Sequence, residues 1–312
     1  MVDMFNNFRV GELDFVMLSF DEPNADDNFR DLQTIVPTAK RSHGVKGFDA
    51  AHRAAADKAE TPVFVTVDAD NVIDPELLNF KVFNPRARDK FAISLNGINS
   101  TNGLVYGNGS IKIWAKKFIY EMNSHENRSE DDGTVDKCDK KSVDFCFEEE
   151  YNSTADTCYS FTVTNGSEYQ SWRSGFREGA KKAILFKEQC MYYKHMGPIN
   201  PQQMIIWATV GADVKYGDIC CDAAVCGMMM YFGNHIPVTG INDYDWLQKF
   251  YDSEWPYWKK KLPELRRSLG AILKIPDVPL LDPIQSQMFK RYMSYQKHIG
   301  KTTQRITEWE IV

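Results

Sequence analysis

The chain of 312 residues is long enough for one large domain or two ordinary ones, and 43% apolar with 13% aromatic residues is typical of a globular protein with a packed core. No run of about 18 apolar residues occurs, which excludes a membrane-spanning helix. The formal net charge of −6 is spread unevenly: residues 121–158 hold 12 acidic against 4 basic side chains, whereas residues 259–305 hold 11 basic against 3 acidic ones.

Predicted strands and helices alternate in the first 95 residues. Segments rich in β-branched and aromatic residues predict strands at 14–20, 63–67 and 91–96. Helices are predicted for residues 24–35, with Asn24 as the N-cap, and for the alanine-rich residues 44–59. This alternation favours an α/β fold, with a Rossmann-like, mostly parallel sheet flanked by helices.

The pattern loosens after residue 100. Residues 103–113 predict a hairpin with its turn at the Gly-Asn-Gly triplet 107–109. The acidic residues 121–158 predict a loop-rich insertion. Residues 167–186 predict a helix, because Trp172, Phe176, Ala180 and Ile184 form one apolar stripe at a spacing of four.

Further helices are predicted towards the C-terminus. Residues 200–211 predict a helix that begins with Asn200 as cap and Pro201 in its first position. From residue 246 the pattern is again helical and becomes basic. The predicted organisation is therefore a main domain over residues 1–245 and a helical, basic extension over residues 246–312.

The number of cysteines and the first residues of the chain predict the cellular compartment of the protein. The chain has 7 cysteines, an odd number, and its first residues lack a basic region followed by an apolar run. We therefore expect reduced thiols, no membrane association and a cytoplasmic location. Cys138, Cys146 and Cys158 do not match a zinc-binding spacing, and residues 220–226 predict a helix that buries its cysteines.

Two carboxylates follow the most apolar strand. In "VFVTVDAD" the buried run Val63–Val67 leads directly to Asp68 and Asp70. Side chains two residues apart on an extended backbone point to the same side, and two adjacent carboxylates repel unless a cation lies between them. Since the carboxyl ends of parallel strands are where open α/β sheets bind ligands, these aspartates predict a site for a divalent cation that carries a diphosphate.

The order of these features resembles the GT-A glycosyltransferases, especially their family 2-like group. The stretches "FVMLSFDEPNADDNF" and "HGVKGFDAAHRAAADKAETPVFVTVDADNVIDPELL" carry the resemblance, clearly over residues 14–80 and loosely over residues 91–245. Among these enzymes the chain is most similar to glycosyltransferases of tailed phages that modify hydroxymethylated DNA bases. If the chain is encoded by a phage, the expected cytoplasmic location is the host cytoplasm. The resemblance implies a hexosyl- or pentosyltransferase that uses a nucleoside-diphosphate sugar, expected to be a UDP-sugar.

The resemblance also implies roles for the donor-binding residues. Phe20 would stack on the base, Asp21 or Glu22 would bond to the base or ribose, and Lys46 would reach the base or the diphosphate. Asp68 and Asp70 would bind Mn²⁺ or Mg²⁺ between the two phosphates. His195 is the first candidate for a third metal ligand, and His235 is the second.

A basic row on the helix of residues 167–186 supplies further candidates. Arg173, Arg177 and Lys181 recur at a spacing of four, so they can reach phosphate oxygens or pair with the acidic insertion. Glu178 or Asp213 would take the acceptor proton if the enzyme inverts configuration. The expected catalytic residues are thus Asp70, Arg177 and Glu178, and Arg173 is expected to contact the donor.

Several functions remain open at the level of the sequence. The acceptor is either double-stranded DNA with hydroxymethylated bases, for which the basic residues 259–305 would supply phosphate contacts, or a glycan or protein. A nucleotidyltransferase would share the α/β sheet and the acidic metal site, but the segment after its first strand would be basic, whereas here it is acidic. A third reading is a module that binds nucleotide sugars without catalysis. The sugar, the stereochemistry and the oligomeric state are not determined by the sequence.

Overall fold

The computed structural model describes residues 7–83, 89–122, 152–188, 201–236, 240–241 and 243–297. By its internal contacts the chain divides into two compact units. The described residues of unit 1 fall within Met1–Ser100, Leu104–Ser129 and Phe145–Val163, and those of unit 2 within Thr101–Gly103 and Thr164–Val312. This division does not fall at residue 245, where the sequence predicts the boundary between two domains. That domain boundary stays a prediction.

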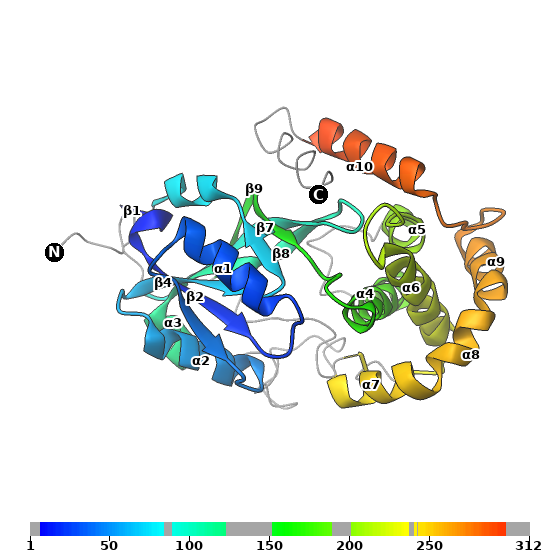
Figure 1. Ribbon diagram of the computed structural model, residues 1–312, viewed down its shortest axis with the longest axis horizontal. Coiled ribbons are helices and arrows are strands. Elements are labelled where there is room, and N and C mark those ends of the chain that lie inside the picture. Colours follow the sequence, from blue (N-terminus) through cyan, green and yellow to red (C-terminus); the bar gives the residue numbers. More distant parts are fainter. Residues whose placement is uncertain are drawn as a thin grey trace. The chain divides into compact units, whose positions relative to one another are not determined.

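A seven-stranded sheet in the order β3-β2-β4-β8-β7-β9-β5 forms the centre of unit 1 (Figure 1). The strands are β2 (Asp14–Ser19), β3 (Lys40–His43), β4 (Val63–Asp68), β5 (Asn71–Ile73), β7 (Ala92–Asn99), β8 (Val105–Ala115) and β9 (Asn152–Thr162). The pairs β2–β3, β2–β4 and β7–β9 are parallel, whereas β8 and β5 run against their neighbours. Most strands thus share one direction, which confirms the α/β prediction.

Short elements complete unit 1. A separate antiparallel pair joins β1 (Asn7–Arg9) to β6 (Lys81–Phe83). The 3₁₀ turns η1 (Val10–Glu12) and η2 (Pro75–Asn79) and the helix α3 (Lys116–Glu121) connect the strands.

Helices α1 (Ala25–Ile35) and α2 (Phe48–Lys58) cover opposite faces of the parallel strands. Arg41 of β3 stacks on Phe29 of α1, and Arg41 lies level with Met17 and Val67 in the sheet. Thr66 precedes Val67 and therefore points to the other face. There its hydroxyl accepts a hydrogen bond from the Trp114 indole, against which His52 of α2 packs.

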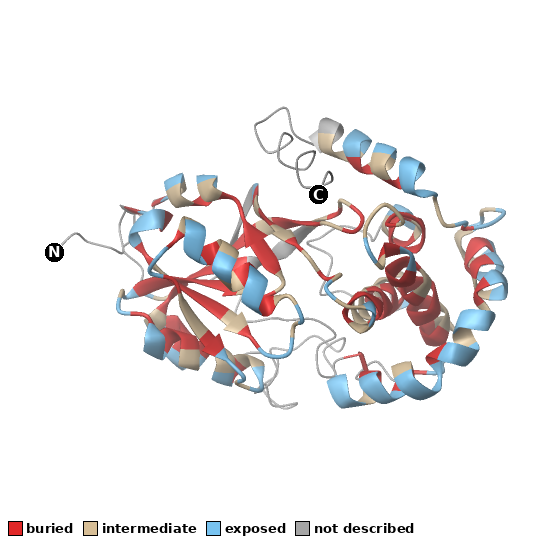
Figure 2. Cartoon of the chain, in the orientation of Figure 1, coloured by how far each residue is buried: buried red, intermediate tan, exposed pale blue. Residues whose placement is uncertain are grey.

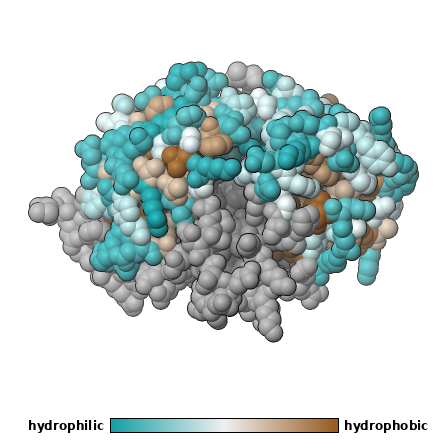
Figure 3. All heavy atoms as spheres, turned by 90° about the horizontal axis from the view of Figure 1, so that it is seen from below, coloured by the Kyte–Doolittle hydropathy of each residue, from teal (hydrophilic) through white to brown (hydrophobic). Residues whose placement is uncertain are grey.

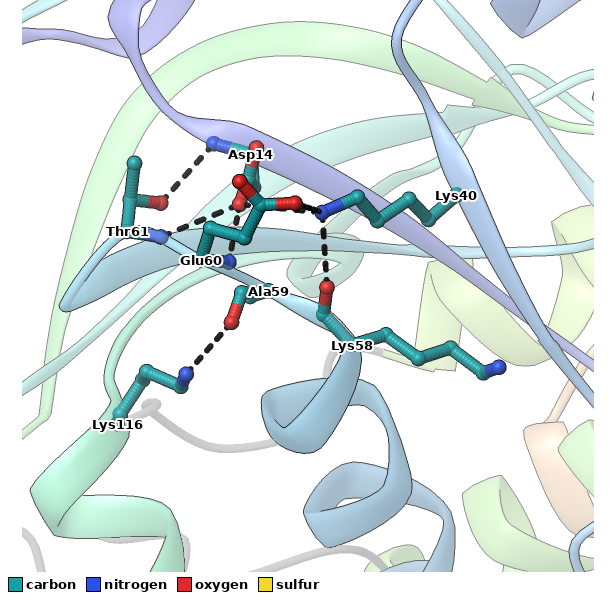
Figure 4. Close-up of polar contacts among 7 residues, drawn as sticks. All are labelled: Asp14, Lys40, Lys58, Ala59, Glu60, Thr61 and Lys116. Carbon is teal, nitrogen blue, oxygen red and sulfur yellow. Dashed lines mark hydrogen bonds and ion pairs between the residues drawn. The ribbon is translucent and has the colours of Figure 1, made fainter.

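Polar contacts anchor the amino ends of the parallel strands, at the edge away from Asp68 (Figure 4). The Asp14 carboxylate accepts hydrogen bonds from the backbone N–H groups of Glu60 and Thr61. Lys40 Nζ donates to the carbonyl of Lys58 at 2.9 Å and to the Glu60 carboxylate at 2.7 Å. These contacts fix the position at which β4 begins. The strand then runs through the buried residues 63–67 and ends at Asp68.

Within residues 100–160 the predicted hairpin turn is wrong, and the predicted insertion is wrong at its C-terminal end. The expected Gly-Asn-Gly turn lies inside β8, which pairs with β4 and β7 on its two sides. The hairpin turn occupies residues 100–104 instead, where Asn99 N–H donates to the Leu104 carbonyl and Gly103 adopts a φ of +74°. Residues 152–158 belong to β9 rather than to a loop-rich insertion, because they pair with the core strand β7. The rest of the insertion, residues 123–151, lies outside the described residues.

Unit 2 is helical in the part of the chain that the structure describes. Its helices are α4 (Glu168–Glu188), α5 (Pro201–Thr209), α6 (Gly217–Phe232), α7 (Tyr244–Ser253), α8 (Trp255–Lys260), α9 (Leu262–Leu273) and α10 (Pro283–Lys297). Every residue of the predicted stripe on α4 is buried, and so are Cys220, Cys221 and Cys226 on α6 (Figure 2). The predictions of an apolar stripe and of buried cysteines are confirmed.

Helices α4 and α6 approach each other closely because glycines face the partner backbone. A Cβ atom on Gly175 would lie 2.0 Å from the carbonyl oxygen of Cys220, and one on Gly179 would lie 2.2 Å from that of Ala224. From the other helix, a Cβ on Gly227 would lie 2.2 Å from the carbonyl oxygen of Phe176. Real Cβ atoms do not fit at such distances, so only glycine permits this packing.

Buried ion pairs connect the C-terminal helices to the rest of unit 2. Arg266 of α9 bonds to the Asp222 carboxylate at 2.6 Å and to the carbonyls of Ala208 and Val278. Lys290 of α10 lies 2.5 Å from the Asp213 carboxylate, and the two side chains are only 3% and 7% exposed. Two bases of the predicted basic stretch are thus buried against acids rather than displayed to a partner.

No helix in the described ranges is long and apolar enough to cross a bilayer. The described residues on the face in Figure 3 are mainly hydrophilic, with hydrophobic residues in small groups.

Candidate functional site

The carboxyl ends of the three parallel strands β2, β3 and β4 meet at one edge of the sheet. Ser19 of β2 pairs with His43 of β3, and Leu18 of β2 pairs with Asp68 of β4. The loop after β2 and the turn after β4 therefore begin side by side. The sequence prediction that Asp68 ends a buried strand is confirmed, since residues 63–67 are almost wholly inaccessible.

The turn from Asp68 to Asn71 is held by its neighbours. Ala69 N–H donates to the Leu18 carbonyl at 2.8 Å, and the buried Asn28 amide of α1 donates to the Ala69 carbonyl at 2.7 Å. The Asp70 carbonyl accepts from Val163 N–H at 2.6 Å. The backbone between the two carboxylates is thereby fixed from the strand, the helix and the segment after β9, so the carboxylates are presented by a rigid frame.

Asp70 lies next to a polar side-chain relay. The Asn71 amide donates to Asp70 Oδ1 at 2.6 Å, and the Thr162 hydroxyl of β9 donates to Asn71 Oδ1 at 3.1 Å. A hydrogen bond to a carboxylate favours its charged form and fixes its orientation. Asp70 as a whole is half-buried.

Asp68 is an acid in an environment that resists its charge. Burial raises the pKa of Asp68 above its ordinary value of 3.8, the Lys112 ammonium lowers that pKa, and the Glu22 carboxylate raises it again. Lys112 belongs to β8 and lies opposite Thr66, which places it on the same face as Asp68. A carboxylate with a raised pKa at a strand end is typical of a ligand site.

The loop after β2 carries the predicted base-binding residues. Phe20 is 48% exposed, which is unusual for a phenylalanine and leaves its ring accessible. Glu22 folds back, and its carboxylate accepts a hydrogen bond from Phe20 N–H at 2.7 Å. Asp21 is exposed, and Lys46 is exposed in the segment that enters α2. The structure places the Phe20–Glu22 segment and Asp68 at the same edge, but the nucleotide contacts of these residues stay a prediction.

Sequence reasoning missed two residues at this edge. His43 Nδ1 lies 2.9 Å from Ser19 Oγ, to which the Arg41 guanidinium also donates at 2.7 Å. A hydroxyl has one proton and two lone pairs, so Ser19 Oγ can accept from Arg41 and still either donate to or accept from His43 Nδ1. Lys112 is the second missed residue. Its signal was a lysine in the alternating apolar run "IKIW", where an apolar residue is expected.

The other predicted site residues lie in unit 2. Arg177 Nε donates to the Ile241 carbonyl at 2.7 Å, and Arg173 and Arg177 both stack on Tyr244. Glu178 forms a half-buried ion pair with Lys181 at 2.9 Å. The catalytic roles of Arg177 and Glu178 and the donor contact of Arg173 stay predictions, and the contacts shown are those of residues that hold helices together.

The remaining candidates have other positions. Asp213 is paired with Lys290, and the His235 ring is exposed and lies 5.9 Å from Trp258 within unit 2. His195 lies outside the described residues, so its predicted role as a third metal ligand is untested.

The acidic turn suits a hard divalent cation in the chemistry of its donors. Asp68 and Asp70 offer carboxylate oxygens from one rigid turn, and Mg²⁺ or Mn²⁺ commonly combines one or two carboxylates with water and phosphate oxygens. Within the described residues there is no group of three or more histidine, cysteine or acidic side chains that could hold a metal. Asp68 and Asp70 would hold the ion against its ligand, and the ion would supply positive charge to the phosphates of that ligand.

Comparison with known proteins gives a single kind of match. No protein-family model matches the chain, and no curated protein matches it. Among solved structures, the chain is similar to the crystal structure of S. aureus TarS 1-349, with 12% identity and a TM-score of 0.27 over 77% of this chain and 91% of that chain. A TM-score this low carries no weight in assigning a function to the present chain.

Proposed function

We propose that the chain is a metal-dependent glycosyltransferase of the GT-A type, which takes a sugar from a nucleoside-diphosphate sugar, most simply a UDP-sugar. The observation that supports this best is the Asp68–Asp70 turn, which is fixed at the carboxyl end of a buried strand, at the same sheet edge as the exposed Phe20. A cation-binding pair of carboxylates and an accessible aromatic ring at one sheet edge match the two ends of a nucleoside diphosphate.

Each described residue of the site would have its own role in binding the donor or in transferring the sugar. The Phe20 ring would stack on the base, and Asp21 or Glu22 would bond to the base or ribose. Asp68 and Asp70 would hold Mn²⁺ or Mg²⁺ against the two phosphates, where the ion offsets the charge that develops on the departing diphosphate. Glu178 or Asp213 would serve as the base only if the enzyme inverts configuration, and both are engaged in ion pairs in the present structure.

For the acceptor we propose the hydroxymethyl group of a modified pyrimidine in DNA, as the phage resemblance implies. Lys259 and Lys260 of α8 are exposed next to Tyr257, which is itself 54% exposed, and these residues would contact phosphates without reading the base sequence. Lys261 is less suited to this role because it lies 3.5 Å from the Glu264 carboxylate.

The test is to incubate the protein with Mn²⁺ and a panel of nucleotide sugars, and to measure release of the nucleoside diphosphate. Each reaction is run with hydroxymethylated DNA, with unmodified DNA, with a glycan mixture and without acceptor. Release that depends on Mn²⁺ and on hydroxymethylated DNA supports the whole proposal, whereas release only with glycans replaces the acceptor. Binding of nucleotide sugars without any turnover supports a non-catalytic module, and pyrophosphate release from a nucleoside triphosphate supports a nucleotidyltransferase.

Neutralising Lys259, Lys260 and Lys261 together tests the DNA surface separately. The triple variant should bind DNA more weakly and with a flatter dependence on salt, because fewer counterions are released. Its hydrolysis of the donor without acceptor should stay at the wild-type rate. DNA affinity that is immeasurable at low salt, or indifferent to salt, in the wild type would rule out the DNA acceptor.

A further inference from the structure

Lys112 is a charged residue in the middle of a core strand. Its neighbours along β8, Ile111 and Ile113, are completely buried, and Lys112 itself is only 6% exposed. Burying an ammonium group costs several kcal/mol unless opposite charge or hydrogen bonds compensate it. An apolar residue could fill the same space at a lower cost in free energy. The burial of Lys112 therefore indicates that its positive charge has a function.

The register of the sheet places this charge at the acidic turn. Lys112 lies directly opposite Thr66 in the antiparallel pair β4–β8, so the two side chains share a face. The hydrogen bond from the Trp114 indole to the Thr66 hydroxyl confirms that face, because Trp114 is two residues from Lys112 on β8. Asp68 is two residues beyond Thr66 and points to the same side. Lys112 therefore shares a face of the sheet with Asp68, and its positive charge lowers the pKa of that carboxyl.

With a metal and a diphosphate bound, negative charge would exceed positive charge at this edge of the sheet. A divalent metal on Asp68 and Asp70 would be neutralised by those two carboxylates, and Glu22 adds a further negative charge near Asp68. A diphosphate brought to this metal would keep most of its own negative charge uncompensated. An additional positive group beside the turn would compensate it, and a buried ammonium is effective because little water screens it.

We propose that the ammonium group of Lys112 contacts the diphosphate of the nucleotide donor, beside the metal held by Asp68 and Asp70. This inference rests on the proposed function and adds a donor-binding residue to it. In the absence of donor the same ammonium compensates Asp68, so the lysine exchanges part of its interaction with a carboxylate for one with a phosphate. The contact requires the phosphates and not the base, and this distinction makes it testable.

The experiment compares UDP with uridine as ligands, in saturating Mn²⁺, by titration calorimetry. Lys112→Met keeps the apolar stem of the side chain and removes the charge. We expect its UDP affinity to fall by about tenfold to a hundredfold, which is the ordinary range for a lost hydrogen bond to a charged group. Its uridine affinity should equal that of the wild type. Lys112→Arg should show a smaller loss for UDP and none for uridine, since it keeps the charge with a changed shape.

A matched control is Lys117→Met, because Lys117 is an exposed lysine just beyond β8 that pairs with Asp89. It should bind both ligands as the wild type does. If Lys112→Met does not fold, Lys112→Arg is used instead. Its UDP affinity should fall relative to its uridine affinity.

Equal affinity of the Lys112 variants and the wild type for UDP, or equal losses for UDP and uridine, would overturn the inference and leave the proposed function standing. A wild-type protein that binds no UDP and no nucleotide sugar in Mn²⁺ would instead remove the proposed function, and the inference with it.

Discussion

Charged side chains have opposite uses in the two units. At the sheet edge of unit 1, Asp68 is an acid whose pKa is raised by burial, and it is only partly compensated by Lys112. In unit 2, Asp213 and Asp222 are joined to Lys290 and Arg266 in close ion pairs that connect α9 and α10 to the helical core. Burial also raises the pKa of Asp222, and there the Arg266 guanidinium opposes the rise. Charge in unit 2 thus holds helices together, whereas the acids at the edge of unit 1 lie where we propose that a ligand binds.

The largest effect on activity is expected at Asp70. Asp70→Asn removes one anionic oxygen ligand while keeping the shape of the turn, so we expect sugar transfer to fall by about a thousandfold, in line with several kcal/mol of lost metal assistance. Circular dichroism and the melting temperature should be unchanged. The matched control in unit 2 is Asp252→Asn, an exposed acid on α7 that should leave transfer unaffected. Wild-type activity that survives complete chelation of divalent metal would contradict this assignment.

The largest effect on stability is expected at Lys290. Lys290→Met leaves the Asp213 carboxylate buried without its cation, so we expect a loss of about 3–5 kcal/mol in the free energy of unfolding. Urea denaturation measures it. The double variant Lys290→Met with Asp213→Asn should recover much of the loss, because no charge then stays unpaired. If the single variant unfolds like the wild type, the pair does not hold α10.

A smaller loss is expected from the helix contact in unit 2. Gly179→Ala places a methyl group against the backbone of α6, and overpacking of this kind costs about 1–3 kcal/mol. Thermal unfolding of this variant is compared with Ser174→Ala, a change of similar size at a half-exposed position of the same helix. Only the glycine variant should melt at a lower temperature, and similar melting of both would mean that the helices can separate at little cost.

Phe20→Ala tests the base platform of unit 1. We expect about tenfold weaker binding of UDP in calorimetry with little change in kcat, because stacking on a base is remote from the reacting bond and is worth about 1–3 kcal/mol. Tyr257→Ala removes an equally exposed ring from unit 2 and should not change UDP affinity. Unchanged affinity in the Phe20 variant would reassign this ring to another role.

The smallest effect is a gain in stability at Asp68. Because burial raises the pKa of Asp68 above 3.8, the folded chain holds this proton more tightly than the unfolded chain does, and ionisation costs stability. The cost is absent below pH 3.8 and appears as the pH rises through the raised pKa. Asp68→Asn should therefore melt above the wild type at pH 7 and together with it at pH 3. A variant that melts below the wild type at pH 7 would show that the Asp68 charge is stabilising.

Local patterns in the sequence determined the elements and part of the site. The run Val63–Val67 is short, almost wholly apolar and rich in β-branched residues, which predicts a buried strand with Asp68 at its end. The stripe on α4 follows from a spacing of four, which puts side chains on one face of any helix. These features depend on residues near each other in the chain, and a periodic pattern is sufficient to predict them.

The tertiary structure alone decided which distant residues meet. Lys112 lies opposite Thr66 because β8 pairs with β4, and nothing local to either strand specifies that pairing. In the same way, Arg266 and Lys290 belong to a basic stretch by sequence but are buried against acids from α6 and from the turn before it. Strand order and the pairing of charges depend on contacts between segments that are far apart in the chain. Composition and periodicity therefore predict the helices and strands of this protein, whereas their packing determines which charged side chains meet.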